Sequence, residues 1–281
     1  MSEYFWRRMK NSEVSAVEKM LRAIEDRYVG ACGRFLLRDD SNDPVWVLRG
    51  KKGGLLGLVI NSRSTLMPVL CGKKEIPPLR FLGGFFKKKY IHSAQGQKED
   101  VLVLQDALEK TGRNIMDIYD YDLMSIDKPP DQKSRSAGPA NLILRLPKMT
   151  DLDSMAALQA AYEKEEVMHR GSVFSPAASR VNAANIIAKA QVLVAEIDGR
   201  LVGKINVSAV SFTRYQVGGV YVHPDFRGLG IARRMAAEFI TSLINEGRGV
   251  TLFVKKTNAT ARKLYTSLGF SAKGDYRITY Y

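Results

Sequence analysis

The second half of the chain alternates between strand-like and helix-like patterns of apolar and polar residues. Residues 217–222 are mostly small or β-branched, which is typical of a buried strand. A His-Pro-Asp break follows at residues 223–225. Apolar side chains then recur at helical spacing, at Ile231, Met235, Phe239 and Leu243. The pattern predicts a strand, a short turn and a helix over residues 231–244.

The turn between this strand and this helix is rich in glycine. Its residues are Arg227, Gly228, Leu229, Gly230, Ile231 and Ala232. Glycine keeps the backbone clear of side chains, so the N–H groups of the first helical turn face outward at the positive end of the helix dipole. Such a helix start favours a diphosphate. Taken alone, the turn is equally consistent with glycines that only allow tight packing.

A second strand and helix follow at residues 250–254 and from Asn258 onward. Asn258 and Tyr265 are seven residues apart, so they share one face of the helix two turns along. Gly269 is placed to end the helix in the left-handed conformation. Two further strands are predicted to begin at Phe270 and at Tyr276. Earlier elements are predicted as a strand at 142–146, helices at 151–166 and 176–188, and a hairpin of residues 191–197 and 201–210.

The two motifs, in this order, resemble the GNAT acetyltransferase superfamily over about residues 142–281. They read R-x-x-G-x-A at residues 227–232 and N-x-x-A-x-x-x-Y-x-x-x-G-F at residues 258–270. The resemblance implies an α/β (α+β) fold with a mixed central sheet flanked by helices. It also implies an N-acetyltransferase that passes an acetyl group from acetyl-CoA to an amine by direct attack in a ternary complex. The alternative is a catalytically weak regulatory protein that binds acyl-CoA.

The resemblance also assigns roles to single residues. The backbone of Val220, Tyr221 and Val222 would hold the pantetheine arm and the acetyl carbonyl, and an N–H there would stabilise an oxyanion. The diphosphate of CoA would lie on Arg227, Gly228, Leu229, Gly230, Ile231 and Ala232. Asn258 would contact the cofactor arm or cap its helix, or both. Tyr265 would act as a general acid, or be a core tyrosine.

The general base is the weak point of this assignment, because the strand before the turn carries no carboxylate. Glu165 and Glu166 lie where the family builds its acceptor pocket, and Glu196 in the preceding hairpin is a further candidate. A chain of water molecules is an alternative to all three. No metal site is implied.

The first half of the chain has a similar outline without the motifs. A helix is predicted at residues 14–24, a hairpin at 45–48 and 55–60, a strand at 65–70, a helix at 98–111 and a strand at 115–126. We expect either a divergent GNAT-like repeat or an unrelated α+β domain. Residues 93–97 are the nearest match to the diphosphate turn, with a single glycine. One coenzyme site per chain is therefore expected, and the first half would serve as a scaffold, an acceptor-binding wall or a homodimer surface.

Pro129, Pro130 and Pro139 punctuate residues 127–140 and indicate a linker between domains at 1–126 and 141–281. The net charge of +14 favours anionic partners such as CoA. The lysines are dispersed in short clusters, so nucleic acid is not expected. Apolar runs fall short of the roughly 20 residues of a membrane span. The two cysteines read as reduced thiols, which predicts a cytoplasmic protein.

Overall fold

The computed structural model describes residues 4–38, 43–50, 53–71, 86, 89–189 and 191–281. These residues group into two compact units. The N-terminal unit comprises Met1–Leu123, Phe253–Thr257 and Ala272–Tyr281, and the C-terminal unit comprises Met124–Leu252 and Asn258–Ser271. The chain thus passes from one unit to the other more than once.

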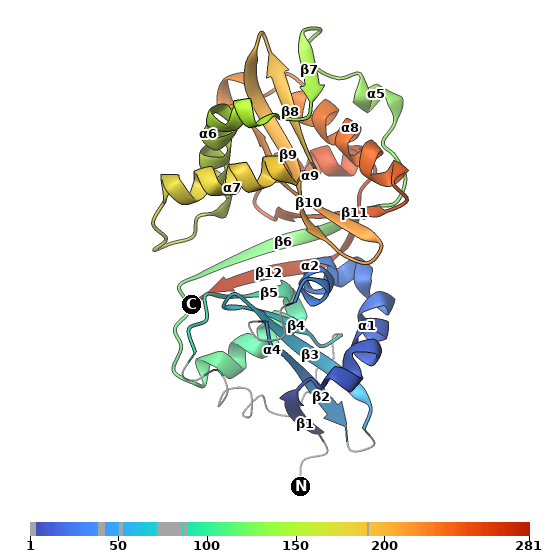
Figure 1. The fold of residues 1–281 in the computed structure, drawn as a ribbon, viewed down its shortest axis with the longest axis vertical. Coiled ribbons are helices and arrows are strands. Elements are labelled where there is room, and N and C mark those ends of the chain that lie inside the picture. The colour runs from blue at the N-terminus through green and yellow to red at the C-terminus, as the bar shows by residue number, and fades with distance from the viewer. Residues whose placement is uncertain (1–3, 39–42, 51–52, 72–85, 87–88, 190) are drawn as a thin grey trace. The chain divides into compact units, whose positions relative to one another are not determined.

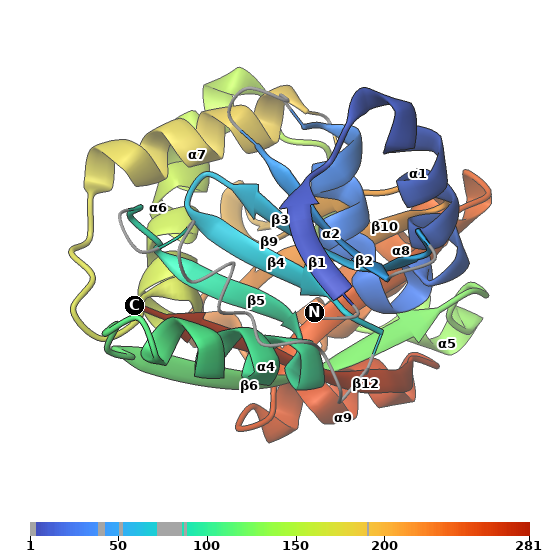
Figure 2. The same cartoon turned by 90° about the horizontal axis from the view of Figure 1, so that it is seen from below.

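The N-terminal unit is built on a sheet whose strands run in the order β1 (Tyr4–Arg8), β2 (Val45–Gly50), β3 (Leu55–Ser62), β4 (Thr65–Val69), β5 (Ser93–Gln97) and β12 (Ser271–Tyr280). Neighbours are antiparallel except β4 and β5, which are parallel. Helices α1 (Val14–Ala23) and α2 (Glu25–Leu36) lie between β1 and β2 in the chain, and α4 (Lys98–Glu109) and β6 (Asp117–Ile126) follow β5 (Figures 1 and 2).

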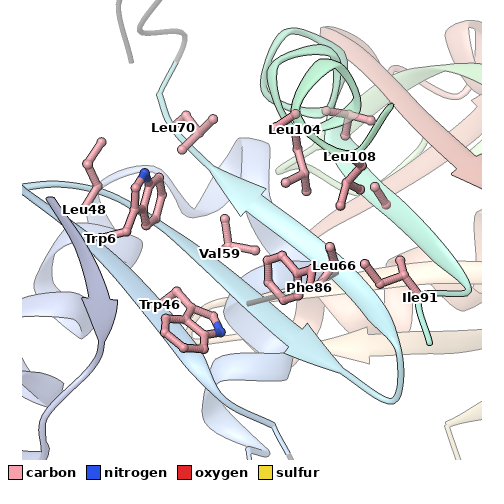
Figure 3. Close-up of a cluster of buried hydrophobic side chains, with 13 residues drawn as sticks. Trp6, Trp46, Leu48, Val59, Leu66, Leu70, Phe86, Ile91, Leu104 and Leu108 are labelled. Atoms are coloured by element: carbon pink, nitrogen blue, oxygen red, sulfur yellow. The ribbon is translucent and has the colours of Figure 1, made fainter. Parts of the chain in front are cut away.

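One face of this sheet carries an apolar core of the N-terminal unit. Strand residues with alternating inward side chains, such as Trp46, Val59 and Leu66, meet Leu104 and Leu108 from one side of α4 (Figure 3). Period-two alternation in the strands and the i, i+4 spacing in the helix explain why these residues meet. Each fully buried side chain of this size contributes roughly 1.5–3 kcal/mol to stability.

The C-terminal unit is also built on a sheet flanked by helices. Its strands follow the order β7 (Leu142–Arg145), β8 (Val192–Ile197), β9 (Arg200–Val210), β10 (Arg214–Val222) and β11 (Gly249–Lys255). Neighbours are antiparallel except β10 and β11, which are parallel. The helices are α5 (Gln132–Arg135), α6 (Leu152–Tyr162), α7 (Pro176–Ala188), α8 (Ile231–Asn245) and α9 (Ala259–Ser267).

Both units therefore share a topology. In each, three antiparallel pairs are followed by one parallel pair, and two helices separate the first strand from the second. The predicted fold class is confirmed. The N-terminal unit has an order of helices and strands like that of the C-terminal unit, as the GNAT-like interpretation of the first half proposed. Among the described helices, every one is too short or too polar to cross a bilayer.

Two elements differ from the expected ones in the first half. Helix α2 was not predicted, and its interior explains why: Tyr28 departs from helical φ/ψ, and Gly30 and Gly33 weaken the helical pattern. Residues 93–97, the nearest match to a diphosphate turn, form strand β5 instead, and Gly96 pairs with Arg277. These residues complete a ladder with β12 and do not form a turn.

The second half differs in two places as well. Gln132–Arg135, inside the expected linker, forms a short helix whose first turn is capped by Asp131, which accepts from the Ser134 N–H at 2.8 Å. The two final strands are one strand, β12, and residues 272–281 group with the N-terminal unit. There Tyr276 stacks on Phe253 with ring centroids 4.9 Å apart. Pairing with β5, which lies far back in the chain, leaves no local sequence signal.

This placement of β12 predicts a specific effect of truncating Tyr276, which is 8% exposed. Tyr276→Ala should destabilise the protein by about 3 kcal/mol, because it removes a large buried ring and leaves a cavity. Tyr276→Phe, the matched control, should stay within about 1 kcal/mol of wild type. Urea unfolding measures both. Hydrogen exchange should then accelerate in residues 93–97; if those amides keep their protection, β12 does not support β5.

Candidate functional site

Strand β10 of the C-terminal unit contains a bulge where it pairs with β9. Gly218 pairs with Asn206 on β9 and Tyr221 pairs with Lys204, so Gly219 and Val220 together oppose one residue, Ile205. Gly219 has a φ of +61°, in the left-handed region that favours glycine. A Cβ there would lie 2.1 Å from Asn206 Oδ1 and 2.7 Å from Lys204 Nζ. The bulge therefore requires glycine for both its backbone angle and its neighbours.

The other edge of β10 is only partly paired. The parallel ladder with β11 joins Arg214, Gln216 and the residue between them to residues 249–251. Residues 217–222 continue past this ladder. The bulge thus lies where β10 and β11 are no longer joined, and this is the position at which the sequence predicted a binding strand at residues 220–222.

The glycine turn after β10 has the geometry expected for an anion site. Gly228 and Gly230 have φ values of +82° and +80°. Gly230 is the N-cap of α8 and offers no side-chain cap. The Arg234 N–H makes the first helical hydrogen bond, to the Gly230 carbonyl at 3.1 Å. The preceding N–H groups of the first turn therefore lack acceptors within the helix.

The space around the two turn glycines differs. A Cβ at Gly228 would meet nothing within 4 Å, whereas one at Gly230 would lie 3.1 Å from the backbone nitrogen of Gly138. The turn is thus open on the Gly228 side and packed against residues 137–138 on the Gly230 side. This open cradle, with backbone donors and no acidic side chain in residues 227–232, fits a diphosphate.

The side chain of Arg227, the first residue of the turn, forms hydrogen bonds to other parts of the protein. Its Nε donates to the Val222 carbonyl at 2.9 Å, and Nη2 donates to both Glu165 oxygens at 3.1 and 2.8 Å. The Tyr221 hydroxyl donates to the same carboxylate at 3.1 Å. The hydrogen bond to Glu165 raises the pKa of Arg227 above its ordinary value. Glu165 is therefore held by a cation and a phenol.

Helix α9 places Asn258 and Tyr265 as its spacing predicted. Asn258 is the N-cap, since its Oδ1 accepts from the Ala261 N–H at 3.0 Å. Its Nδ2 lies 3.5 Å from Glu166 Oε1. Tyr265 is 6% exposed, and burial, with the neighbouring Tyr162 and Glu166, raises its pKa. The phenol thus stays protonated at neutral pH, as a proton donor requires.

The three carboxylates named from the sequence have different surroundings. Glu165 and Glu166 belong to the π-helical turn Glu163–Val167 that follows α6, so they lie together near Tyr221 and Asn258. Glu196 instead accepts from Arg145 Nε at 2.7 Å, and Arg145 also binds Asp151. Glu196 thus takes part in an ion-paired group between β7, β8 and the start of α6.

The feature that sequence reasoning missed is Lys204 on β9. It is fully buried, at 0% exposure. Its Nζ donates to the Gly219 carbonyl at 2.9 Å and to Asn206 Oδ1 at 3.3 Å, and lies 4.6 Å from the centroid of the Tyr162 ring. Burial lowers the pKa of Lys204 to about 7, against a smaller opposing effect of Glu163. The signal was visible as one lysine within the apolar run of residues 201–205.

Comparison with known protein families gives a match over part of the chain. Residues 157–270 match the family described as Acetyltransferase (GNAT) family. No curated protein sequence matches the chain significantly.

Solved structures extend the similarity over nearly the whole chain. A GCN5-related N-acetyltransferase from Sphaerobacter thermophilus gives a TM-score of 0.66 at 17% identity and covers 99% of this chain and 95% of that one. A tandem GNAT protein from the clavulanic acid biosynthesis pathway, solved without AcCoA, gives 0.63 at 13%, covering 99% and 98%. A GCN5-related N-acetyltransferase-like protein from Streptococcus suis gives 0.58 at 14%, covering 96% and 98%. At these identities the similarity establishes the fold.

The buried lysine predicts a pH-dependent stability. A lysine whose pKa falls from 10.5 unfolded to about 7 folded binds more protons in the unfolded state between those values. Stability should therefore rise with pH across this window, by about 2 kcal/mol from pH 7 to 9 for this group alone. Lys204→Met should remove that part of the rise, whereas Lys263→Met on the exposed side of α9 should keep it. Urea unfolding at the two pH values measures it, and an unchanged slope in Lys204→Met contradicts the assignment.

Proposed function

Because residues 157–270 match the family described as Acetyltransferase (GNAT) family, we propose that this protein transfers an acetyl group from acetyl-CoA to an amine. The single observation that carries the proposal is the uncapped start of α8, preceded by two left-handed glycines and adjoining the bulged strand β10. An anion-binding helix start beside an unpaired strand segment suits a ligand with a diphosphate at one end and a carbonyl at the other.

Two segments of the chain bind the two ends of such a ligand. The N–H groups of residues 228–232 bind the diphosphate, and the backbone of residues 220–222 binds the arm and the carbonyl. Arg227 keeps the turn against β10 through its hydrogen bond to the Val222 carbonyl. When bound, the CoA thioester supplies the activated acyl group.

The acceptor amine approaches from the turn that follows α6. Glu163, Glu165 and Glu166 lie on this turn, and a cluster of carboxylates attracts a protonated amine. Glu165 is shared with Arg227 and Tyr221, and Glu196 is bound by Arg145. Glu166 lies 3.5 Å from Asn258 Nδ2 and contributes to the raised pKa of Tyr265, so it stands beside both residues of the α9 face. Because of this position, we assign acceptor binding, and removal of its proton, to Glu166.

Tyr265 is assigned the role of general acid. Its phenol is protonated at neutral pH and lies on the α9 face that carries Asn258. A proton delivered from this hydroxyl would neutralise the departing thiolate.

The diphosphate assignment predicts a charge effect at Gly228. Gly228→Asp should weaken CoA binding at least about tenfold, because it places a carboxylate in the open space beside the N–H groups. Gly228→Asn is the matched control, since asparagine has the same shape, tolerates the left-handed region equally and carries no charge. It should bind within about threefold of wild type. Calorimetry with CoA, expected at one site per chain, decides; equal weakening by both variants would contradict an electrostatic cause.

The general-acid assignment predicts separate effects on turnover and binding. Tyr265→Phe keeps the buried ring, so CoA affinity should stay nearly unchanged while turnover falls by roughly 10²-fold. The readout is free thiol released from acetyl-CoA with a panel of acceptor amines, with slow hydrolysis as the fallback. Unchanged turnover would make Tyr265 a packing residue. A parallel loss of affinity would mean that its hydroxyl holds CoA instead.

A further inference from the structure

Lys204 is a buried amine that has no role in the proposed chemistry. It is inaccessible to solvent, and its contacts are the Gly219 carbonyl, the Asn206 side chain and the Tyr162 ring. Burying an amine costs several kcal/mol unless its partners compensate. A methionine of similar length would fill the same space without that cost. The lysine therefore needs an explanation other than packing.

The geometry of the bulge supplies one. The described peptide bonds are all trans, so the C=O and N–H of one peptide unit point in opposite directions. Lys204 Nζ holds the Gly219 carbonyl at 2.9 Å. The N–H of the same peptide unit belongs to Val220, and it must point away from Lys204. Fixing the carbonyl from one side thus fixes the direction of the Val220 N–H on the other.

The lysine also changes the strength of that N–H as a donor. A hydrogen bond to an amide oxygen draws electron density toward the oxygen and makes the N–H of the same amide a better donor, by perhaps 10–30% per bond. A charged donor in a buried, low-dielectric place gives the larger effect. Asn206 and the Tyr162 ring hold the amine so that it stays on the carbonyl.

We infer that Lys204 is a positioning residue that aims and polarises the Gly219–Val220 peptide, so that the Val220 N–H binds the acyl carbonyl oxygen of the bound thioester. This inference rests on the proposed function. It differs from a general-base role, because Lys204 acts through a backbone peptide and touches no substrate. Gly219 belongs to the same device, since a Cβ there would displace both Lys204 and Asn206.

The charged and titratable groups around Lys204 come from two elements. Tyr162 and Glu163 lie at the end of α6, and Tyr221 lies opposite Lys204 on β10, with Glu165 bonded to its hydroxyl. Burial raises the pKa of Tyr221, so its phenol stays protonated near neutral pH. Lys204, with its pKa near 7, changes charge between about pH 6 and 9.

The test is the infrared band of acetyl-CoA carrying ¹³C at the thioester carbonyl, measured free and bound to the full chain. In wild type the band should move to lower wavenumber on binding. Lys204→Met should lose at least about half of that shift while binding acetyl-CoA within about threefold of wild type. Gln216→Met is the matched control: it removes a buried polar side chain of the neighbouring strand β10, before the bulge, and should keep the full shift.

Thermal unfolding separates this role from a merely structural one. Lys204→Met should melt at the same temperature as wild type or higher, while its carbonyl shift is reduced. Wild type alone gives an independent measurement, since its shift should shrink from about pH 6 to 9 as Lys204 loses its proton. A full shift in Lys204→Met, or a pH-independent shift in wild type, overturns the inference. Absence of acetyl-CoA binding in wild type instead overturns the proposed function, and this inference with it.

Discussion

The bulge in β10 is the constraint on which the rest of the C-terminal unit depends. β10 must pair along its length with β9, yet it pairs with β11 over only three positions. One extra residue in β10 resolves this conflict, because it turns the Gly219–Val220 peptide out of the ladder. Gly219 makes the turn feasible, and Lys204 donates a hydrogen bond to the carbonyl of the displaced peptide.

This arrangement exchanges stability for a defined backbone geometry. A buried amine whose pKa falls from 10.5 to about 7 destabilises the folded state progressively as the pH drops through that range, and the left-handed backbone angle restricts position 219 to glycine. Such costs gather where a protein must hold a group in one orientation. The ion pair of Arg227 with Glu165 differs, since both side chains are about half exposed and contribute little stability. It joins the glycine turn to the π-helical turn Glu163–Val167.

The sequence predicted well where the signal is local. Helix α8, its glycine turn and the Asn258 cap follow from spacing within a few residues, and the structure has them at those positions. It failed where partners are distant. Glu165 lies 62 residues before Arg227, and β12 pairs with a strand more than 170 residues earlier. Lys204 was visible as a polar residue in an apolar strand, but its partner is a carbonyl, which any residue carries. Backbone partners leave no trace in a sequence pattern.

The N-terminal unit shows that the shared topology is not enough for the proposed chemistry. Its strand β4 occupies the place that β10 holds in the C-terminal unit, next to a parallel neighbour. The register between β3 and β4 runs without a shift from Ser62 paired with Thr65 to Leu58 paired with Val69. β4 has no extra residue in this stretch, so its peptides keep a regular register with β3. None of them is displaced from the ladder as the Gly219–Val220 peptide is. Because a carbonyl-binding N–H depends on that displacement, we expect the N-terminal unit to keep the fold and leave acyl binding to the C-terminal unit.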